Sequence, residues 1–92
     1  MTEPTITHPW TMDVTIKDET GTDAREGKRA EVRLEDGSGN SFTGIGIASG
    51  DLYGLAVPQI KEELAIARAL SDLTEELLAA VAADVHAALN TV

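Results

Sequence analysis

The feature that most constrains the fold of this chain is one helical pattern in its last third, from Val57 to Leu89. The apolar residues there recur in steps of three and four, the spacing that keeps one face of a helix out of water. They are Ile60, Leu64, Ala67, Leu70, Leu73, Leu77, Val81, Val85 and Leu89, and the opposite side carries Lys61, Arg68, Asp72, Glu75, Glu76 and His86. The pattern predicts a helical segment over about residues 59–90, which Pro58 begins.

This segment is too long and too broadly apolar for one small sheet. Unbroken, it runs about 48 Å, whereas strands of eight or so residues run about 25 Å. Its apolar arc covers about 180°, against roughly 100° for a helix on one surface. Either it breaks near Ser71-Asp72, where Asp72 and Glu75 have capping-box spacing, or its overhang packs on another subunit. In both cases we predict a homodimer, with interface candidates Leu73, Leu77, Val81 and Val85.

Three segments that precede the helix alternate between apolar and polar residues, which is the period of a strand. They cover about residues 11–18, 28–36 and 41–48. The residues between the second and third segments, Asp36 to Asn40, are rich in Gly and Asn and predict a hairpin loop. The predicted fold class is therefore α+β, with a three-stranded antiparallel meander followed by a long or broken C-terminal helix packed on one face.

Two details of the predicted strands bear on packing. In the second strand, Ala30, Val32 and Leu34 are expected to point inward. In the third, Gly44 and Gly46 share a face, and glycines inside a strand often mark close approach of another backbone.

A chain of 92 residues is expected to form one domain. We assign residues 1–9 to a flexible tail and residues 10–92 to the folded unit. No apolar run of 18 residues exists, and the N-terminus lacks the basic and apolar regions of a signal peptide, so we expect a cytoplasmic protein. The absence of cysteine removes disulfides, thiolate nucleophiles and cysteine metal sites together.

The charge balance disfavours several partners. There are 16 acidic residues and 7 lysines and arginines, which gives a formal net charge of −9. Because binding to nucleic acid depends on cations that neutralise phosphates, such a chain is a poor ligand for DNA or RNA, and equally for an anionic membrane. Binding to a basic protein is electrostatically more favourable than binding to nucleic acid or to an anionic membrane.

One basic cluster stands against this balance. It consists of Arg25, Lys28, Arg29 and Arg33, interspersed with glutamates in the first predicted hairpin. Opposite charges that face one another across strands stabilise a sheet, so a salt-bridged outer face is the favoured interpretation. A weak anion site is the alternative.

No residues form a recognisable catalytic, metal or cofactor site. His8 and His86 are the only histidines, and a zinc site needs three or four ligands. Glu62-Glu63 and Glu75-Glu76 are adjacent pairs, which point about 100° apart on a helix and do not converge on one reacting atom. In Gly44 to Gly50, the third glycine is one position late for a dinucleotide loop and no helix follows directly. We therefore predict no cofactor, no metal and no enzymatic activity.

The stretch from Val57 to Leu73, VPQIKEELAIARALSDL, resembles the hallmark of a small actinobacterial family of unknown function. The strand Gly44-Ile45-Gly46-Ile47-Ala48 and the two leading strands also fit, so the resemblance covers about residues 11–80. Members include short mycobacterial hypothetical proteins. The resemblance implies a fold like the double-stranded RNA-binding domain, an association with stress or dormancy, and an architectural likeness to small ribosome-binding stress factors.

Two classes of function follow from these observations, and an enzyme is a distant third. The first is a non-catalytic, dimeric protein-interaction module that acts through its apolar helix and acidic field. The second is a ribosome- or RNA-associated stress factor that uses the cluster from Arg25 to Arg33. Double-stranded RNA-binding domains place a lysine cluster at the start of their last helix, where this chain has one lysine and two acids between Gln59 and Glu63. No RNA-binding residue is therefore carried over from the resemblance.

Overall fold

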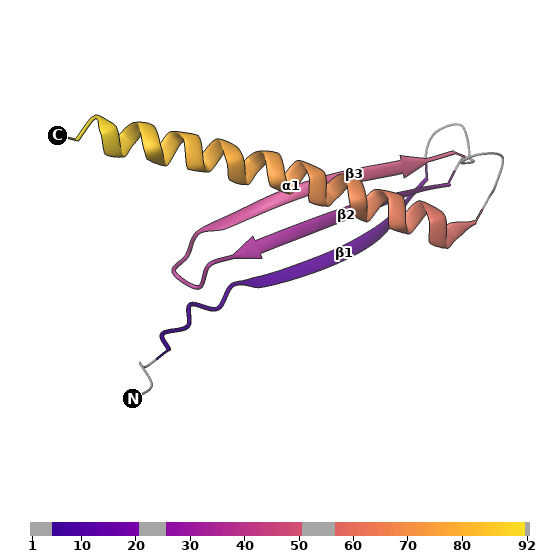
Figure 1. Cartoon of the computed structure of the whole chain (residues 1–92). Coiled ribbons are helices and arrows are strands. Elements are labelled where there is room, and N and C mark those ends of the chain that lie inside the picture. The colour runs from indigo at the N-terminus through magenta and orange to yellow at the C-terminus, as the bar shows by residue number, and fades with distance from the viewer. Residues whose placement is uncertain (1–4, 21–25, 51–56, 92) are drawn as a thin grey trace.

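The computed structural model describes residues 5–20, 26–50 and 57–91. They form three strands and one helix, in the order β1 (Thr11–Thr20), β2 (Glu26–Glu35), β3 (Ser41–Ser49) and α1 (Pro58–Leu89). The strands pair antiparallel in the spatial order β1-β2-β3, and α1 crosses one face of this sheet (Figure 1). The predicted α+β fold, a meander followed by a C-terminal helix, is confirmed.

The first hairpin is longer than the sequence pattern indicated. β1 continues to Thr20, past residue 18, and β2 begins at Glu26, before residue 28. In the register of the hairpin, Asp18 lies opposite Lys28, and the two side chains form an ion pair. Opposite charges across a strand pair support the ladder beyond its apolar part.

The register places even-numbered residues on the face that α1 covers. Val14 lies opposite Val32, and Val32 lies opposite Gly44. Ala30 and Val32 are fully buried, and Leu34 packs against the core while partly exposed. The predicted inward set of β2 is therefore confirmed.

α1 approaches β3 so closely that the two backbones touch. A Cβ atom on Gly44 would lie 2.6 Å from the backbone nitrogen of Leu73, and one on Gly46 would lie 2.8 Å from the carbonyl carbon of Arg68. Real Cβ atoms do not approach other atoms this closely, so only glycine fits at these two positions. The close approach predicted from the strand glycines is confirmed. The core around it consists of Ala30, Val32, Ala48, Ala65, Ala69 and Leu73.

The buried stripe of α1 differs from the expected one in the first half of the helix. It consists of Lys61, Ala65, Ala69 and Leu73. The expectation that Lys61 lies on the solvent side is wrong, since this residue is 8% exposed. The reason is steric. Only a row of small residues can approach the glycine-lined strand, and Lys61 lies on this row, one helical turn before Ala65 and two before Ala69. The larger Leu64 is only partly buried.

α1 is one continuous helix of 32 residues, and no break occurs near Ser71-Asp72. Its C-terminal part runs past the end of the sheet (Figure 1), and every described residue from Val81 onward is exposed. The Cα radius of gyration is 18.2 Å, whereas a compact chain of this length has about 12 Å. Of the two alternatives for the helical segment, the structure therefore has the overhanging helix.

Candidate interaction surfaces

The outer edge of β3 is occupied by two side chains of α1. Arg68 donates a hydrogen bond from Nη1 to the carbonyl oxygen of Ile47 at 2.6 Å. Asp72, one turn further along, accepts one at Oδ2 from the backbone N–H of Ile45 at 2.9 Å. Edge strands present unpaired backbone groups that can template pairing with another chain. At β3, the helix itself satisfies two of these groups.

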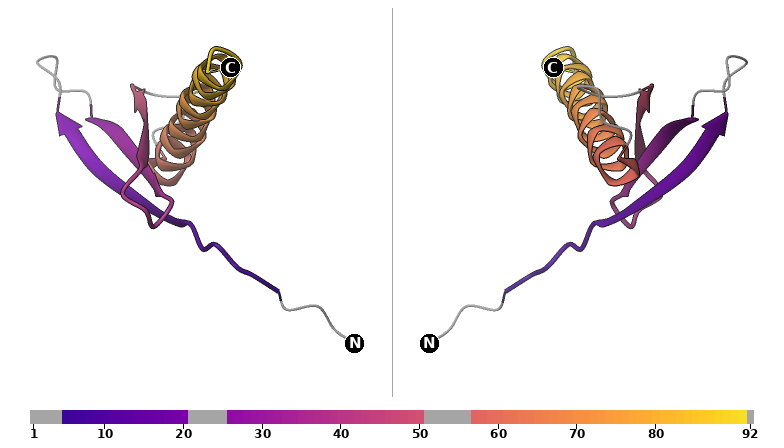
Figure 2. Two further views of the ribbon diagram at one scale, coloured as in Figure 1. Left: turned by 90° about the vertical axis from the view of Figure 1, so that its left-hand side faces the viewer. Right: turned by 90° about the vertical axis from the view of Figure 1, so that its right-hand side faces the viewer.

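β1 forms the other edge of the sheet and lies farthest from α1 (Figure 2). α1 packs mainly on β3 and β2. On the face of the sheet that α1 shares, Met12 is 49% exposed and Val14 is 47% exposed. Just before β1, Trp10 stacks on Phe42 with ring centroids 6.4 Å apart. The result is an apolar surface on β1 that the helix does not cover.

A second apolar surface lies on the exposed C-terminal part of α1. We call Leu78, Val81, Val85 and Leu89 the outer stripe; their exposed fractions are 63%, 57%, 52% and 72%. Their spacing of three, four and four residues keeps them on one helix face. Of the four predicted interface candidates, Val81 and Val85 belong to this stripe. Leu73 is 3% exposed within the core, and Leu77 packs partly against it.

The predicted basic cluster is neutralised within the sheet. Lys28 pairs with Asp18 and lies 3.9 Å from Glu62 on α1. Arg29 pairs with Glu19 at 3.5 Å, as part of the same hairpin. Arg33 pairs through Nε with Glu35 at 2.9 Å. Arg25 lies outside the described residues. The three described cations thus form ion pairs across or along the strands and with the helix, as the salt-bridge interpretation expects.

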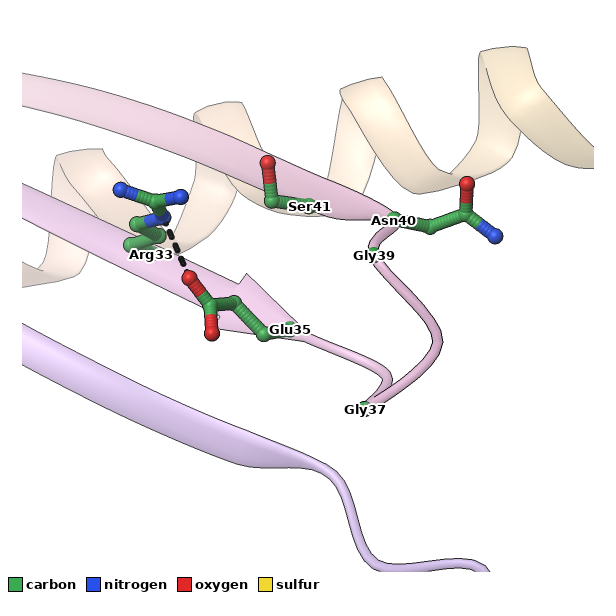
Figure 3. Close-up of a pocket in the computed structure, with 6 residues that line it drawn as sticks. All are labelled: Arg33, Glu35, Gly37, Gly39, Asn40 and Ser41. Atoms are coloured by element: carbon green, nitrogen blue, oxygen red, sulfur yellow. Dashed lines mark ion pairs between the residues drawn. The ribbon is translucent and has the colours of Figure 1, made fainter.

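The β2–β3 loop contains a shallow hollow lined by Arg33, Glu35, Gly37, Gly39, Asn40 and Ser41 (Figure 3). Beside it, the Asp36 carboxylate accepts hydrogen bonds from the Ser38 backbone N–H at 2.8 Å and from Asn40 Nδ2 at 3.0 Å. These bonds, that of Ser38 N–H above all, lower the pKa of Asp36 from 3.8 to about 2. Gly37 and Gly39 have positive φ values of 80° and 101°, which glycine adopts readily, and the hydrogen bonds to Asp36 close the turn.

The described residues bring no catalytic set together. His8 and His86 are both exposed, and a ring nitrogen of His86 lies 2.9 Å from Asn90 Nδ2 on the same helix. No group of three or more acidic or histidine side chains within the described ranges is arranged to hold a metal ion. Nor does that part of the chain contain a helix long and apolar enough to cross a membrane.

Sequence reasoning missed the roles of Arg68 and Asp72, because it placed both on the solvent side of the helix and considered Asp72 only as part of a capping box. The available signal was the pair of strand glycines. Because α1 touches β3 and β3 lies at the sheet edge, the polar side chains beside the contact can reach the outer backbone groups of β3.

Comparison with known proteins places the chain among similar mycobacterial proteins. A family model described as Rv2632c-like matches residues 8–92. The uncharacterized protein Rv2632c of Mycobacterium tuberculosis is 44% identical over 65 residues, which cover 71% of this chain and 69% of the relative. The uncharacterized protein Mb1767 of Mycobacterium bovis is 35% identical over 78 residues, 85% of this chain and 77% of the relative.

The fold is shared with a solved structure. The crystal structure of Rv2632c superposes with a TM-score of 0.74 at 36% sequence identity, and the match covers 98% of this chain and 100% of that one. No enzyme family is indicated by these relatives.

Proposed function

The chain belongs to the Rv2632c-like family, and we propose that it is a non-catalytic protein-interaction module that works as a homodimer. Family membership bears out the resemblance that residues 57–73 carry. The observation that supports an interaction role is the outer stripe of α1.

The outer stripe needs a partner for physical reasons. In a folded protein, a helix gains most of its stability from tertiary packing of an amphipathic face. The overhanging part of α1 has no sheet beneath it, yet it carries Leu78, Val81, Val85 and Leu89 on one exposed face. Contiguous exposed apolar surface of this kind marks interaction sites in soluble proteins. A second copy of α1, which presents the same stripe, supplies a self-complementary apolar surface across a two-fold axis.

The test is the mass of the assembly at micromolar concentration, measured by light scattering. In Val81→Asp/Val85→Asp, each copy would bury two carboxylates in the contact, so this contact should be lost and the mass of the assembly should fall. The matched control is Ala79→Asp/Ala83→Asp, which adds the same charge to exposed positions on the opposite side of the same helix segment. A monomeric wild-type protein, or equal behaviour of the two variants, would refute the proposal.

The association with stress or dormancy is part of the same proposal and depends on the family resemblance. An actinobacterial strain that lacks this protein is expected to resume growth more slowly after prolonged stationary phase than its parent does. Equal recovery of the two strains would remove this part of the proposal without affecting the dimer.

The RNA-associated alternative is less well supported. Lys28, Arg29 and Arg33 are already paired with carboxylates, so a phosphate would have to displace an existing ion pair. Binding driven by phosphate neutralisation weakens steeply with salt. A saturable, salt-sensitive shift in the electrophoretic mobility of a structured RNA at low ionic strength would favour the alternative. We expect no such shift.

A further inference from the structure

The two edges of the sheet differ in how their backbone groups are satisfied. At β3, Arg68 and Asp72 occupy the outward carbonyl of Ile47 and the outward N–H of Ile45. At β1, no hydrogen bond from a side chain of the described residues reaches the outer backbone groups. Natural proteins shield or pair such edges, because an exposed edge recruits further strands. The contrast indicates that β1 is the edge used for pairing.

The outward groups of β1 follow from the antiparallel alternation. Because Ile45 N–H points away from β2, Ile45 and its partner Glu31 form a non-hydrogen-bonded pair. The groups of Glu31 then point toward β1, where Thr15 is its partner. The odd-numbered residues of β1 therefore bond to β2, and the N–H and C=O groups of Val14 and Ile16 face outward.

We propose that β1 pairs antiparallel with β1 of a second copy, across a two-fold axis at Thr15. In this register Val14 faces Ile16 of the second copy on the helix-covered side, and Asp13 faces Lys17 of the second copy on the other side. Both pairs occur twice by symmetry, as an isologous contact requires. The pairing extends the three-stranded sheet into one continuous sheet shared by two copies.

Charge complementarity is what selects this occupant over an unrelated strand. Within its own sheet Lys17 lies opposite Arg29, a like charge. Asp13 lies opposite Arg33, which pairs with Glu35 instead. Neither Asp13 nor Lys17 has an ion-pair partner within 4 Å among the described residues. The proposed register gives each of them an opposite charge directly across the new ladder, where such pairs stabilise a sheet.

The helix does not obstruct this contact, because α1 lies over β3 and β2 (Figure 2). The β1 contact goes beyond the proposed helix-mediated dimer and is separate from it. A protein that uses both contacts forms assemblies larger than a dimer, and each contact can be removed without the other.

A single introduced cysteine tests the register, since the chain contains none. In Thr15→Cys the two copies present the same non-hydrogen-bonded position to each other, with Cα atoms about 4.5 Å apart, within the range that a disulfide bridges. In the control Thr11→Cys, the two sulfur-bearing positions lie about 27 Å apart along the strands. Under mild oxidation we expect Thr15→Cys to cross-link at least tenfold faster than Thr11→Cys. Equal rates would overturn the proposal.

A charge exchange gives a second, independent measurement. Asp13→Lys and Lys17→Asp each place like charges opposite one another in the new ladder, and each should weaken the β1 contact about tenfold. The double variant restores opposite charges and should restore association. These changes are made in the Val81→Asp/Val85→Asp background, which removes the helix contact alone. A monomer in that background, with no preferential cross-linking of Thr15→Cys, overturns the β1 contact and leaves the helix contact standing. If instead the helix contact does not exist, the preferential cross-linking of Thr15→Cys should still be observed.

Discussion

The carboxylate of Asp72 accepts a hydrogen bond at 2.9 Å from the backbone N–H of Ile45, a residue 27 positions earlier in the chain. Together with the bond that Arg68, one turn before, makes to the same strand, this bond holds α1 in the rotation that the close contact with Gly44 and Gly46 sets. Asp72 and Arg68 thus both position the helix and satisfy outward backbone groups of the edge strand β3.

Replacing Asp72 by alanine should lower the free energy of unfolding by about 1 to 2 kcal/mol. A bond from a backbone N–H to a charged acceptor contributes in this range, and partial exposure keeps it at the lower end. Urea unfolding at neutral pH measures the change. Asp84→Ala is the control, because Asp84 is exposed on the overhanging part of α1. Equal losses in the two variants would show that the bond to Ile45 contributes nothing.

The architecture follows from the sequence, but the rotation of the helix does not. Backbone geometry imposes alternation along strands and steps of three and four along a helix. The three strands and the helix accordingly lie where these patterns indicate. Hydrophobicity alone favours Ile60 and Leu64 as the dry face of α1. The contact is decided instead by steric fit to Gly44 and Gly46, which selects Ala65 and Ala69 and buries Lys61 with them. A helical wheel does not contain that information, because it depends on the opposite strand.

Gly44→Ala and Gly46→Ala should each destabilise the protein by about 3 kcal/mol or prevent folding, as overpacking a rigid contact does. The added methyl groups would overlap backbone atoms of α1, which cannot move without lifting the helix from the sheet. Thermal unfolding followed by circular dichroism measures the effect. Gly27→Ala is the matched strand variant, because a Cβ there meets only ordinary contacts of 3.4 Å or more. If all three variants melt alike, the backbone contact is not as close as described.

The lowered pKa of Asp36 predicts that the free energy of unfolding depends on pH, with a defined sign. Its pKa of about 2 in the folded protein lies below the ordinary value of 3.8, because Ser38 and Asn40 hydrogen-bond to the charged form. The stabilisation is therefore present above about pH 4 and is lost as the pH falls toward 2. We expect the difference in unfolding free energy between wild type and Asp36→Asn to shrink over that interval.

Urea unfolding at pH 7 and at pH 2 measures this difference, and an NMR titration of the Asp36 carboxyl measures its pKa directly. Asp84→Asn serves as the comparison, since no side-chain hydrogen bond to Asp84 occurs among the described residues. A difference between wild type and Asp36→Asn that stays constant from pH 7 to pH 2 would contradict the assigned role.

Leu73 tests the packing of α1 on the sheet, and Val81 tests the proposed contact of α1 with a second copy. Leu73 is 3% exposed and Val81 is 57% exposed, although both follow the same apolar pattern. Leu73→Ala should cost about 2 to 4 kcal/mol of stability, because it leaves a cavity between helix and sheet. Val81→Ala should change the stability of a monomer by less than about 0.5 kcal/mol.

Unfolding measured over a range of protein concentrations distinguishes the two effects. Leu73→Ala should lower the unfolding midpoint by the same amount at every concentration, because the contacts it loses lie within one chain. Val81→Ala should lower the midpoint only where the wild-type protein is associated, since assembly stabilises the folded state by mass action. If Val81→Ala gives a shift that is independent of concentration, the outer stripe does not contact a second copy, and the helix-mediated dimer is excluded.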